Sequence, residues 1–352
     1  MALPLKLLQF LDWDSPLQQI GLREELATGL LEPQARIAPK FFYDSLGSRL
    51  FDAITELPEY YPTRTEAAIF NEHLPAISRA MGQDFTLIDL GCGNCGKAGR
   101  LFHAGVLPTR YVAVDISVDF LRGSLQQLKR EFSAIEMTGI GLDFTDRLQL
   151  PDDLPLPRRM FFYPGSSIGN FSPPDAEEFL RRLAAQMDAS GGLLIGVDLI
   201  KDKVVLDAAY DDALGVTAAF NRNLLRHVNA RLDADFDLGD WRHVAYYNTT
   251  DARIEMYLEA RRALSVRWPE ADGQRVRHFA AGERIHTENS YKYSPDGFKA
   301  LLASAGFADI RIWTDPRDWF ALVFARPTAQ ALSVPRSPGP APTRDDRSRP
   351  PP

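Results

Sequence analysis

The stretch LIDLGCGNCGK, residues 87–97, decides the fold class of this chain. The apolar run at 85–90 that leads into it is typical of a buried strand. Glycines follow at Gly91, Gly93 and Gly96, and glycine lets the backbone turn tightly and approach a ligand closely. A strand that ends in such a turn and is followed by a helix is typical of a nucleotide-binding loop in a parallel sheet.

Strands and helices alternate beyond this loop. The pattern predicts strands over 110–116, 137–144, 158–165 and 191–200, with amphipathic helices between several of them. Such alternation indicates an α/β protein whose parallel sheet is covered on both faces. We therefore expect residues 61–200 to form a Rossmann-like core.

The rest of the chain has a different pattern of predicted helices and strands. Residues 1–60 are expected to be helical, and residues 201–285 mix helices with antiparallel strands. Together they are predicted to form a second, smaller α+β lid that binds substrate. Residues 286–327 return to the core with a helix and two closing strands. Residues 328–352 are rich in proline and polar residues, which predicts a disordered tail.

Composition restricts the possible partners. The net charge is −7, and an acidic excess argues against nucleic acid, because phosphate binding needs a basic face. There is no run of about 18 apolar residues, as a membrane span requires. The first residues lack the basic region and the continuous apolar stretch of a signal peptide, so we expect none. Cys92 and Cys95 are the only cysteines, which fits a reducing compartment. We expect a cytoplasmic monomer that acts on a small molecule without membrane or nucleic acid.

Three acidic positions favour S-adenosylmethionine as the ligand of the glycine loop. Asp89 stands two residues before the first loop glycine, as in methyltransferases. Asp115 ends the next strand, where a carboxylate can accept both ribose hydroxyls, and Asp143 ends the following one, where adenine would lie. A nicotinamide-dependent oxidoreductase shares the G-x-G-x-x-G pattern but not normally the third position. The expected cofactor-binding residues are Gly91, Gly93, Lys97, Asp115, Asp143 and Phe144.

The cysteine pair has two interpretations. Zinc needs four ligands, and the sequence has no second cysteine pair and only scattered histidines, so we expect no metal site. Cys92 and Cys95 are then either small residues that fill a crowded loop or a thiol pair with a redox use. The first interpretation is preferred.

Longer blocks resemble the histidine Nα-methyltransferases of ergothioneine biosynthesis, over about residues 35–327. The blocks are PKFFYD (39–44), LPEYYPTRTE (57–66), GSSIGN (165–170), DLIKD (198–202), AYDD (209–212), GVTAAFNRN (215–223), RIEM (253–256), TENSYKY (287–293) and WTDP (313–316). The resemblance implies a methyltransferase that adds three methyl groups from S-adenosylmethionine to the α-amine of L-histidine, giving hercynine.

The resemblance also implies a substrate site. Its binding residues would be Tyr60, Gly165, Asn170, Tyr210, Met256, Glu288 and Ser290, and its catalytic residues Tyr43 and Tyr60. In this set, Asn170 and Tyr210 match residues that hold the substrate carboxylate, and Glu288 and Ser290 match the pair that hydrogen-bonds the imidazole. Such groups suit their ligands, because a ring N–H needs a strong acceptor and a carboxylate is one.

The other implied residues surround the ring and the amine. Met256 matches a residue that packs near the imidazole, and Gly165 matches a backbone position facing the amine. Tyr43 and Tyr60 match substrate-side aromatics, and aromatic faces favour the quaternary ammonium product. No dedicated base is evident, so the amine proton would leave through water or a tyrosine.

Three other functions remain open. The first is N-methylation of another amino acid such as tryptophan or a derivative, since fungal relatives act on a prenylated tryptophan; an apolar residue in place of Glu288 would favour it. The second is a nicotinamide-dependent oxidoreductase. The third is a non-catalytic module that only binds the cofactor. The glycine loop at 91–96 also differs from the Ser-Gly-Thr-Ser-Glu type of the family, which affects the expected loop contacts.

Overall fold

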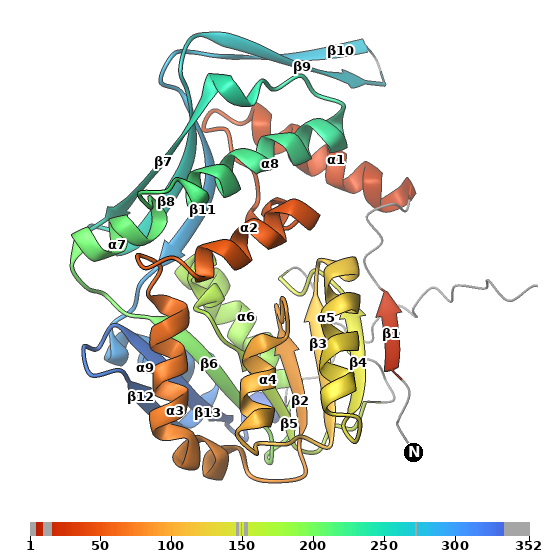
Figure 1. Ribbon diagram of the computed structural model, residues 1–352, viewed down its shortest axis with the longest axis vertical. Coiled ribbons are helices and arrows are strands. Elements are labelled where there is room, and N and C mark those ends of the chain that lie inside the picture. Colours follow the sequence, from red (N-terminus) through yellow and green to blue (C-terminus); the bar gives the residue numbers. More distant parts are fainter. Residues whose placement is uncertain are drawn as a thin grey trace, which may run out of the picture.

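The computed structural model describes residues 5–9, 16–145, 148, 150, 154–271 and 273–333. The described chain forms two lobes, which lie one above the other in Figure 1. The lower lobe is built on a large sheet with helices on both faces. The upper lobe contains helices and antiparallel strands and lies over one end of that sheet. None of the described helices is long and apolar enough to cross a membrane.

The lower lobe contains one eight-stranded sheet in the order β1-β4-β3-β2-β5-β6-β13-β12. The strands are β1 Leu5–Gln9, β2 Thr86–Leu90, β3 Arg110–Asp115, β4 Glu136–Gly141, β5 Arg159–Tyr163, β6 Gly192–Asp198, β12 Phe307–Thr314 and β13 Phe320–Pro327. The six strands from β1 to β6 run parallel. Only β13 is antiparallel to both of its neighbours, β6 and β12. The predicted α/β, Rossmann-like fold is thereby confirmed.

Helices cover both faces of this sheet, as an alternating strand-helix sequence requires. The helices are α3 Pro62–Met81, α4 Gly96–His103, α5 Val118–Glu131, α6 Pro173–Ala185 and α9 Pro295–Ser304. All five residues of β2 are buried. Its Leu87 packs into the core beneath α3, α4 and α5, and the next residue, Ile88, packs into the core beneath α6 and α9. Consecutive residues of this strand thus supply two different cores.

Polar caps set the starts of the helices on the second face. The Ser172 side chain accepts a hydrogen bond from the Asp175 amide at the start of α6. The Ser294 side chain accepts one from the Gly297 amide at the start of α9. Each cap is followed by proline, which suits the first helical position because its missing N–H has no partner there.

The upper lobe, called the lid below, comprises residues 16–60 and 203–291. Its elements are α1 Pro16–Leu31, η1 Pro39–Phe42, α2 Ser45–Thr55, α7 Lys203–Tyr210, α8 Val216–Leu232, η3 Leu238–Asp240, β7 Trp241–Asn248, β8 Arg253–Ala260, β9 Leu264–Glu270, β10 Gly273–Phe279 and β11 Arg284–Tyr291. Strands β11, β8 and β7 form an antiparallel sheet, and β9 and β10 form a ribbon. The lid has its own hydrophobic core, in which Trp241 and Trp268 are fully buried.

Three features differ from the boundaries expected from the sequence. Residues Leu5–Gln9 form a strand that pairs with β4 at the sheet edge, not a helix of the lid. The lid sheet continues beyond residue 285, because β11 ends at Tyr291. Ordered structure continues past residue 328 into η4, Ala331–Ser333, since the Thr328 amide donates to the Gly306 carbonyl at 2.8 Å. The predicted disordered tail from residue 334 onward lies outside the described residues.

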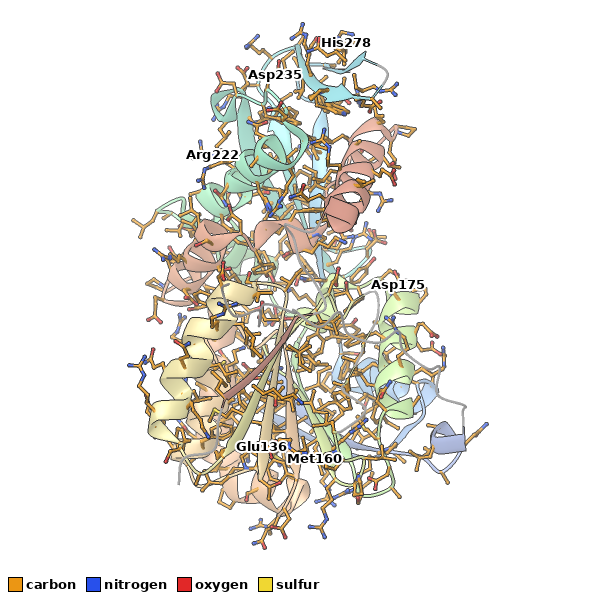
Figure 2. The ribbon with its side chains drawn as sticks, turned by 90° about the vertical axis from the view of Figure 1, so that its right-hand side faces the viewer. Glu136, Met160, Asp175, Arg222, Asp235 and His278 are labelled. Carbon is orange, nitrogen blue, oxygen red and sulfur yellow. The ribbon has the colours of Figure 1, made fainter. Side chains whose placement is uncertain are left out.

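The architecture places a ligand site between the lobes. Figure 2 labels Glu136 and Met160, at the starts of strands, at the end of the sheet far from the lid, and Arg222, Asp235 and His278 on the lid. The carboxyl ends of the parallel strands therefore face the lid. Since β2 has β3 on one side and β5 on the other, the strand order reverses there, and open α/β sheets bind ligands at such a point.

Candidate active site

The substrate-side residues indicated by the sequence all line one cavity between the lobes. The cavity is open to solvent, and its volume is about 50 Å³. The lining includes Tyr43, Tyr60, Gly165, Asn170, Tyr210, Met256, Glu288 and Ser290. The structure adds four apolar residues to which the sequence analysis assigned no role, namely Phe51, Ile54, Ala209 and Phe220. The lid, the loop after β5 and the end of α7 thus contribute to a single chamber.

A β-bulge in β11 turns polar side chains of this strand toward the cavity. The register between β11 and β8 shifts between His286 and Glu288, so that Met256 on β8 lies opposite Glu288. A bulge adds one residue to a strand and reverses which side chains face inward beyond it. Glu288 and Ser290 are consequently both buried on the cavity face, and Lys292 continues the same alternation.

Glu288 is a buried carboxylic acid with unused hydrogen-bonding capacity. It is 8% exposed, and among the described residues its side chain has no hydrogen-bond partner. Burial raises the pKa of Glu288 to about 7, and the positive charge of Lys292 opposes this rise. A carboxylate here can accept a hydrogen bond from a ligand N–H, which offsets the cost of burying its charge.

The cavity is also lined by neutral polar groups. Asn170 ends the short helix η2, Ser167–Asn170, and its amide makes no hydrogen bond within the described part of the chain. Tyr210 ends α7, and its hydroxyl donates to Ser290 Oγ at 2.9 Å. An amide and a phenol can both donate to a carboxylate.

Aromatic rings also line the cavity. The Tyr60 ring meets the Tyr210 ring edge-on at 6.3 Å, and the Tyr43 ring meets the Phe220 ring edge-on at 6.0 Å. Burial raises the pKa of both Tyr43 and Tyr60 above the ordinary value of 10. Both phenols therefore stay protonated at neutral pH, and neither acts as a phenolate base.

The glycine loop follows β2 at the end of the sheet that faces the lid, and its residues are not among the described residues that line the cavity. Gly91 and Gly93 have φ of 67° and 52°, both in the left-handed region that favours glycine. Asp115 orders the loop, because its Oδ2 accepts from the Gly93 amide at 2.8 Å and its Oδ1 from the Ser117 amide at 2.9 Å. Phe144 packs over the turn, and a Cβ at Gly91 would lie 3.6 Å from its ring.

Lys97, one of the expected cofactor-binding residues, forms an ion pair within the protein. Its Nζ lies 2.7 Å from Glu66 Oε2. The other oxygen of Glu66 accepts from the Gly165 amide at 2.8 Å. Glu66 is 2% exposed and thus links α4 to the loop after β5. No local pattern indicated this role, although Glu66 stands in a resembling block.

Asp143 also has protein partners. Its Oδ2 lies 3.3 Å from Lys40 Nζ, and its Oδ1 accepts from the Thr145 amide at 3.1 Å. Lys40 also pairs with Glu25 of the lid at 2.7 Å. The expected adenine side of the site is therefore connected to α1 of the lid through one lysine.

The loop fits S-adenosylmethionine by its acceptors and its open space. Asp89 is buried, and its Oδ2 accepts from the Tyr111 hydroxyl at 2.7 Å while its Oδ1 has no partner in the described chain. Burial raises the pKa of Asp89 to about 7. No atom lies within 4 Å of where a Cβ of Gly93 would be. Carboxylates at Asp89 and Asp115 suit a ligand with ribose hydroxyls and a positive charge.

The cysteine pair supports the packing interpretation. Cys92 and Cys95 are both buried and free. Burial raises the pKa of the Cys92 thiol well above its usual range, so the reactive thiolate is disfavoured. Within the described residues, no group of three or more His, Cys, Asp or Glu side chains could hold a metal ion.

Fold and site together define a class of enzyme. A parallel sheet brings a glycine loop and an acid at the end of β3 to the edge that faces the lid, and a cavity between the lobes is lined by polar and aromatic groups. This is the arrangement expected of a class I methyltransferase that uses S-adenosylmethionine.

Comparison with known proteins gives the family. The profile of the family described as "Histidine-specific methyltransferase, SAM-dependent" matches residues 22–327, and the chain belongs to this family. A "Histidine N-alpha-methyltransferase" of Mycolicibacterium smegmatis is 42% identical over 325 residues, covering 91% of this chain and 99% of that protein. The protein of the same name from Mycobacterium tuberculosis is 41% identical over 320 residues, covering 87% and 95%.

A longer fungal relative also matches. "Ergothioneine biosynthesis protein 1" of Schizosaccharomyces pombe is 28% identical over 321 residues, covering 88% of this chain and 41% of that protein. The resemblance inferred from the sequence blocks and the expected cofactor are both confirmed by these matches. The nicotinamide-dependent alternative is excluded by membership of a methyltransferase family.

Proposed function

We propose that this protein transfers methyl groups from S-adenosylmethionine to the α-amine of L-histidine, three times, to give hercynine. This would be the first step of ergothioneine biosynthesis, in agreement with the names of its relatives. The observation that carries the choice of substrate is Glu288. A buried carboxylate that has no hydrogen-bond partner in the described part of the chain lies opposite Met256, in the same cavity as amide and phenol donors.

Each part of histidine has a partner in this cavity. Glu288 would accept from one ring N–H, and Ser290 would donate to the other ring nitrogen. Asn170 and Tyr210 would hold the carboxylate. This division follows the two sets of polar residues described above, Glu288 and Ser290 on β11 and the neutral pair Asn170 and Tyr210. It excludes side chains without a ring N–H, because such a ligand would leave the Glu288 carboxylate buried and unpaired.

The amine would lie between the aromatic wall and the loop after β5. The Gly165 amide is already bonded to Glu66, which leaves the Gly165 carbonyl as the backbone group available to the amine. Bound S-adenosylmethionine supplies a methyl group attached to a positively charged sulfur. The nitrogen lone pair forms the new bond to that carbon, and the carbon–sulfur bond breaks with its electron pair left on sulfur.

Proton release precedes each transfer, since only a neutral amine has a free lone pair. Tyr43 and Tyr60 remain protonated, and so the proton would leave through water. Their rings instead contribute to binding the cation that accumulates methyl groups, by cation–π attraction. The rest of the rate enhancement comes from holding the reacting atoms in line and excluding solvent.

The test is a survey of substrates by mass spectrometry. Purified protein is incubated with S-adenosylmethionine and each of the twenty amino acids separately, and initial rates are measured. We expect methylation of histidine alone. The Glu288→Ala variant should lose roughly ten- to a hundredfold in kcat/KM, the value of a hydrogen bond to a charged group. Faster methylation of tryptophan or another amino acid by the wild type would contradict the assignment of Glu288 and Ser290 to the imidazole ring.

A further inference from the structure

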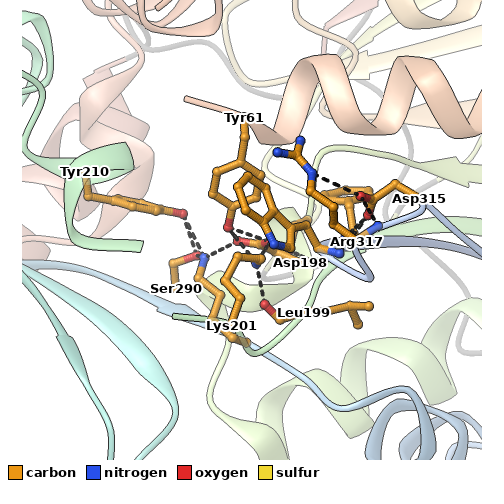
Figure 3. Close-up of polar contacts among 12 residues, drawn as sticks. Tyr61, Asp198, Leu199, Lys201, Tyr210, Ser290, Asp315 and Arg317 are labelled. Atoms are coloured by element: carbon orange, nitrogen blue, oxygen red, sulfur yellow. Dashed lines mark hydrogen bonds and ion pairs between the residues drawn. The ribbon is translucent and has the colours of Figure 1, made fainter. Parts of the chain in front are cut away.

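Two buried lysines, Lys201 and Lys292, share one aspartate, Asp198, and Figure 3 shows this aspartate with Lys201 and Tyr61. Asp198 ends β6 and is 1% exposed, and the side chains of Lys292 and Lys201 are 0% and 3% exposed. Lys292 Nζ lies 2.9 Å from Asp198 Oδ2, and Lys201 Nζ lies 2.6 Å from Asp198 Oδ1. The Tyr61 hydroxyl also donates to Asp198, at 2.7 Å. Burial lowers the pKa of Lys201 to about 8, whereas Asp198 and Tyr210 hold the pKa of Lys292 above its usual value despite burial. Lys292 is therefore the ammonium group of this cluster that keeps its charge.

Lys292 connects this cluster to two polar residues that line the cavity, Tyr210 and Ser290. Its Nζ donates to the Tyr210 hydroxyl oxygen at 3.0 Å and to Ser290 Oγ at 2.8 Å. With Asp198, these contacts use all three donors of the ammonium group. Because both hydroxyl oxygens accept from Lys292, their hydrogens must point elsewhere. The Tyr210 hydroxyl donates to Ser290 Oγ, and Ser290 Oγ, which accepts from both Lys292 and Tyr210, has its own hydrogen directed into the cavity.

The cavity itself lacks a positive side chain. None of the described residues that line it is Lys, Arg or His, and its one acidic side chain is Glu288. The proposed carboxylate partners, Asn170 and Tyr210, are neutral. A free carboxylate placed beside them gains little from charge unless a cation stands close behind. Lys292 stands one hydroxyl away, in a buried environment where such an attraction is weakly screened.

We propose that Lys292 is the positioning residue that makes this site specific for a free amino-acid carboxylate. It supplies the positive charge through the Tyr210 hydroxyl and fixes the orientation of the Ser290 hydroxyl that meets the ring. The inference rests on the proposed function, in that L-histidine occupies this cavity. Lys292 is not a catalytic residue, because the hydroxyls of Tyr210 and Ser290 stand between its ammonium group and the cavity.

The test compares L-histidine with L-histidinamide, which has a neutral group of the same shape in place of the carboxylate. The ratio of their kcat/KM values is measured for the wild type and for Lys292→Met. The amide also has a less basic amine, but that difference cancels when the ratio is compared between proteins. Lys292→Met should keep the fold, because Asp198 retains Lys201 and Tyr61 as partners.

Lys201→Met is the matched control. It removes a buried ammonium group from the same aspartate, but Lys201 bonds Tyr61, Asp198 and the Leu199 carbonyl and makes no contact with the two cavity hydroxyls. We expect Lys292→Met to lower the preference for L-histidine by about tenfold or more, mainly through KM, as for loss of a charge-assisted bond. Lys201→Met should change the preference by less than about threefold, since its charge is more distant.

Two outcomes would overturn the proposal: an unchanged preference in Lys292→Met, or an equal loss in both variants. If Lys292→Met does not purify as a folded protein, Lys292→Gln retains a donor without the charge, and its preference must fall in the same way. If the wild type methylates a different amino acid, that acid and its amide are compared instead. Failure of the proposed function is then separate from failure of this inference.

Discussion

Replacing Glu288 with glutamine should stabilise the ligand-free protein while it weakens histidine binding. Burial raises the pKa of Glu288 from an ordinary 4.5 to about 7. Because the folded-state value is the higher one, the folded protein binds more protons between these pH values, and its stability falls as the pH rises through that window. At about 1.4 kcal/mol per pH unit, the loss reaches roughly 3 kcal/mol above pH 7. Glutamine is neutral and of similar shape, and so removes this loss.

Urea unfolding without ligand, followed by circular dichroism, measures the effect. We expect wild type and Glu288→Gln to differ little at about pH 5 and by roughly 2–3 kcal/mol in free energy of unfolding at about pH 8. Glu259 of β8 is a control of opposite sign, because Arg242 lowers its pKa by hydrogen bonding, as does Arg284. Glu259→Gln should therefore destabilise at the higher pH. A Glu288→Gln variant no more stable than wild type at about pH 8 would refute the reasoning.

Three further predictions follow from the cofactor side and the C-terminal end. Asp115→Ala should weaken S-adenosylmethionine binding by roughly ten- to a hundredfold in calorimetry; unchanged affinity would contradict the loop assignment. Gly165→Ala should lower the melting temperature, because φ is 80° and the new Cβ would lie 2.6 Å from Lys97 Nζ; an unaltered melting curve would contradict this. Deleting residues 334–352 should leave kcat unchanged, whereas deletion from Thr328 should lower stability by removing its bond to Gly306; equal stability of the two truncations would contradict this.

The core of the fold was predictable because its signals are local. The apolar run before Gly91 became β2, and the strand-helix alternation after it became the parallel sheet. Asp115 was predicted from its position at a strand end, and the structure places its carboxylate on the Gly93 amide. Strand β1 could not be predicted in the same way. Leu5–Gln9 is short, and its conformation depends on pairing with β4, far away in the sequence.

The buried charged residues Glu66 and Lys292 are the main features that could not be predicted from the sequence. Glu66 and Gly165 are 99 positions apart, and Lys292 and Tyr210 are 82 apart. A lone Glu or Lys in a sequence is usually solvated, so nothing local marks such residues as buried. One signal for Lys292 was present, since it follows Glu288 and Ser290 at the spacing of one strand face. The bulge at Thr287 was not predictable from that spacing.

The two halves of the site are also linked through charges that the sequence did not connect. Glu66 joins Lys97 of α4 to the Gly165 amide, and Lys40 joins Asp143 to the lid. Each link runs from a cofactor-side residue to a substrate-side or lid element. Cofactor binding is therefore expected to influence the order of the substrate cavity through these contacts.

The central claim is that the α-amine of histidine is the group that receives the methyl groups. The most direct measurement uses S-adenosylmethionine with a deuterated methyl group, L-histidine and purified protein, followed by fragmentation of the product in a mass spectrometer. The account predicts three labelled methyl groups, all on the α-nitrogen, with the imidazole unlabelled. Label on a ring nitrogen, or no transfer to histidine by protein that binds the cofactor, would contradict it.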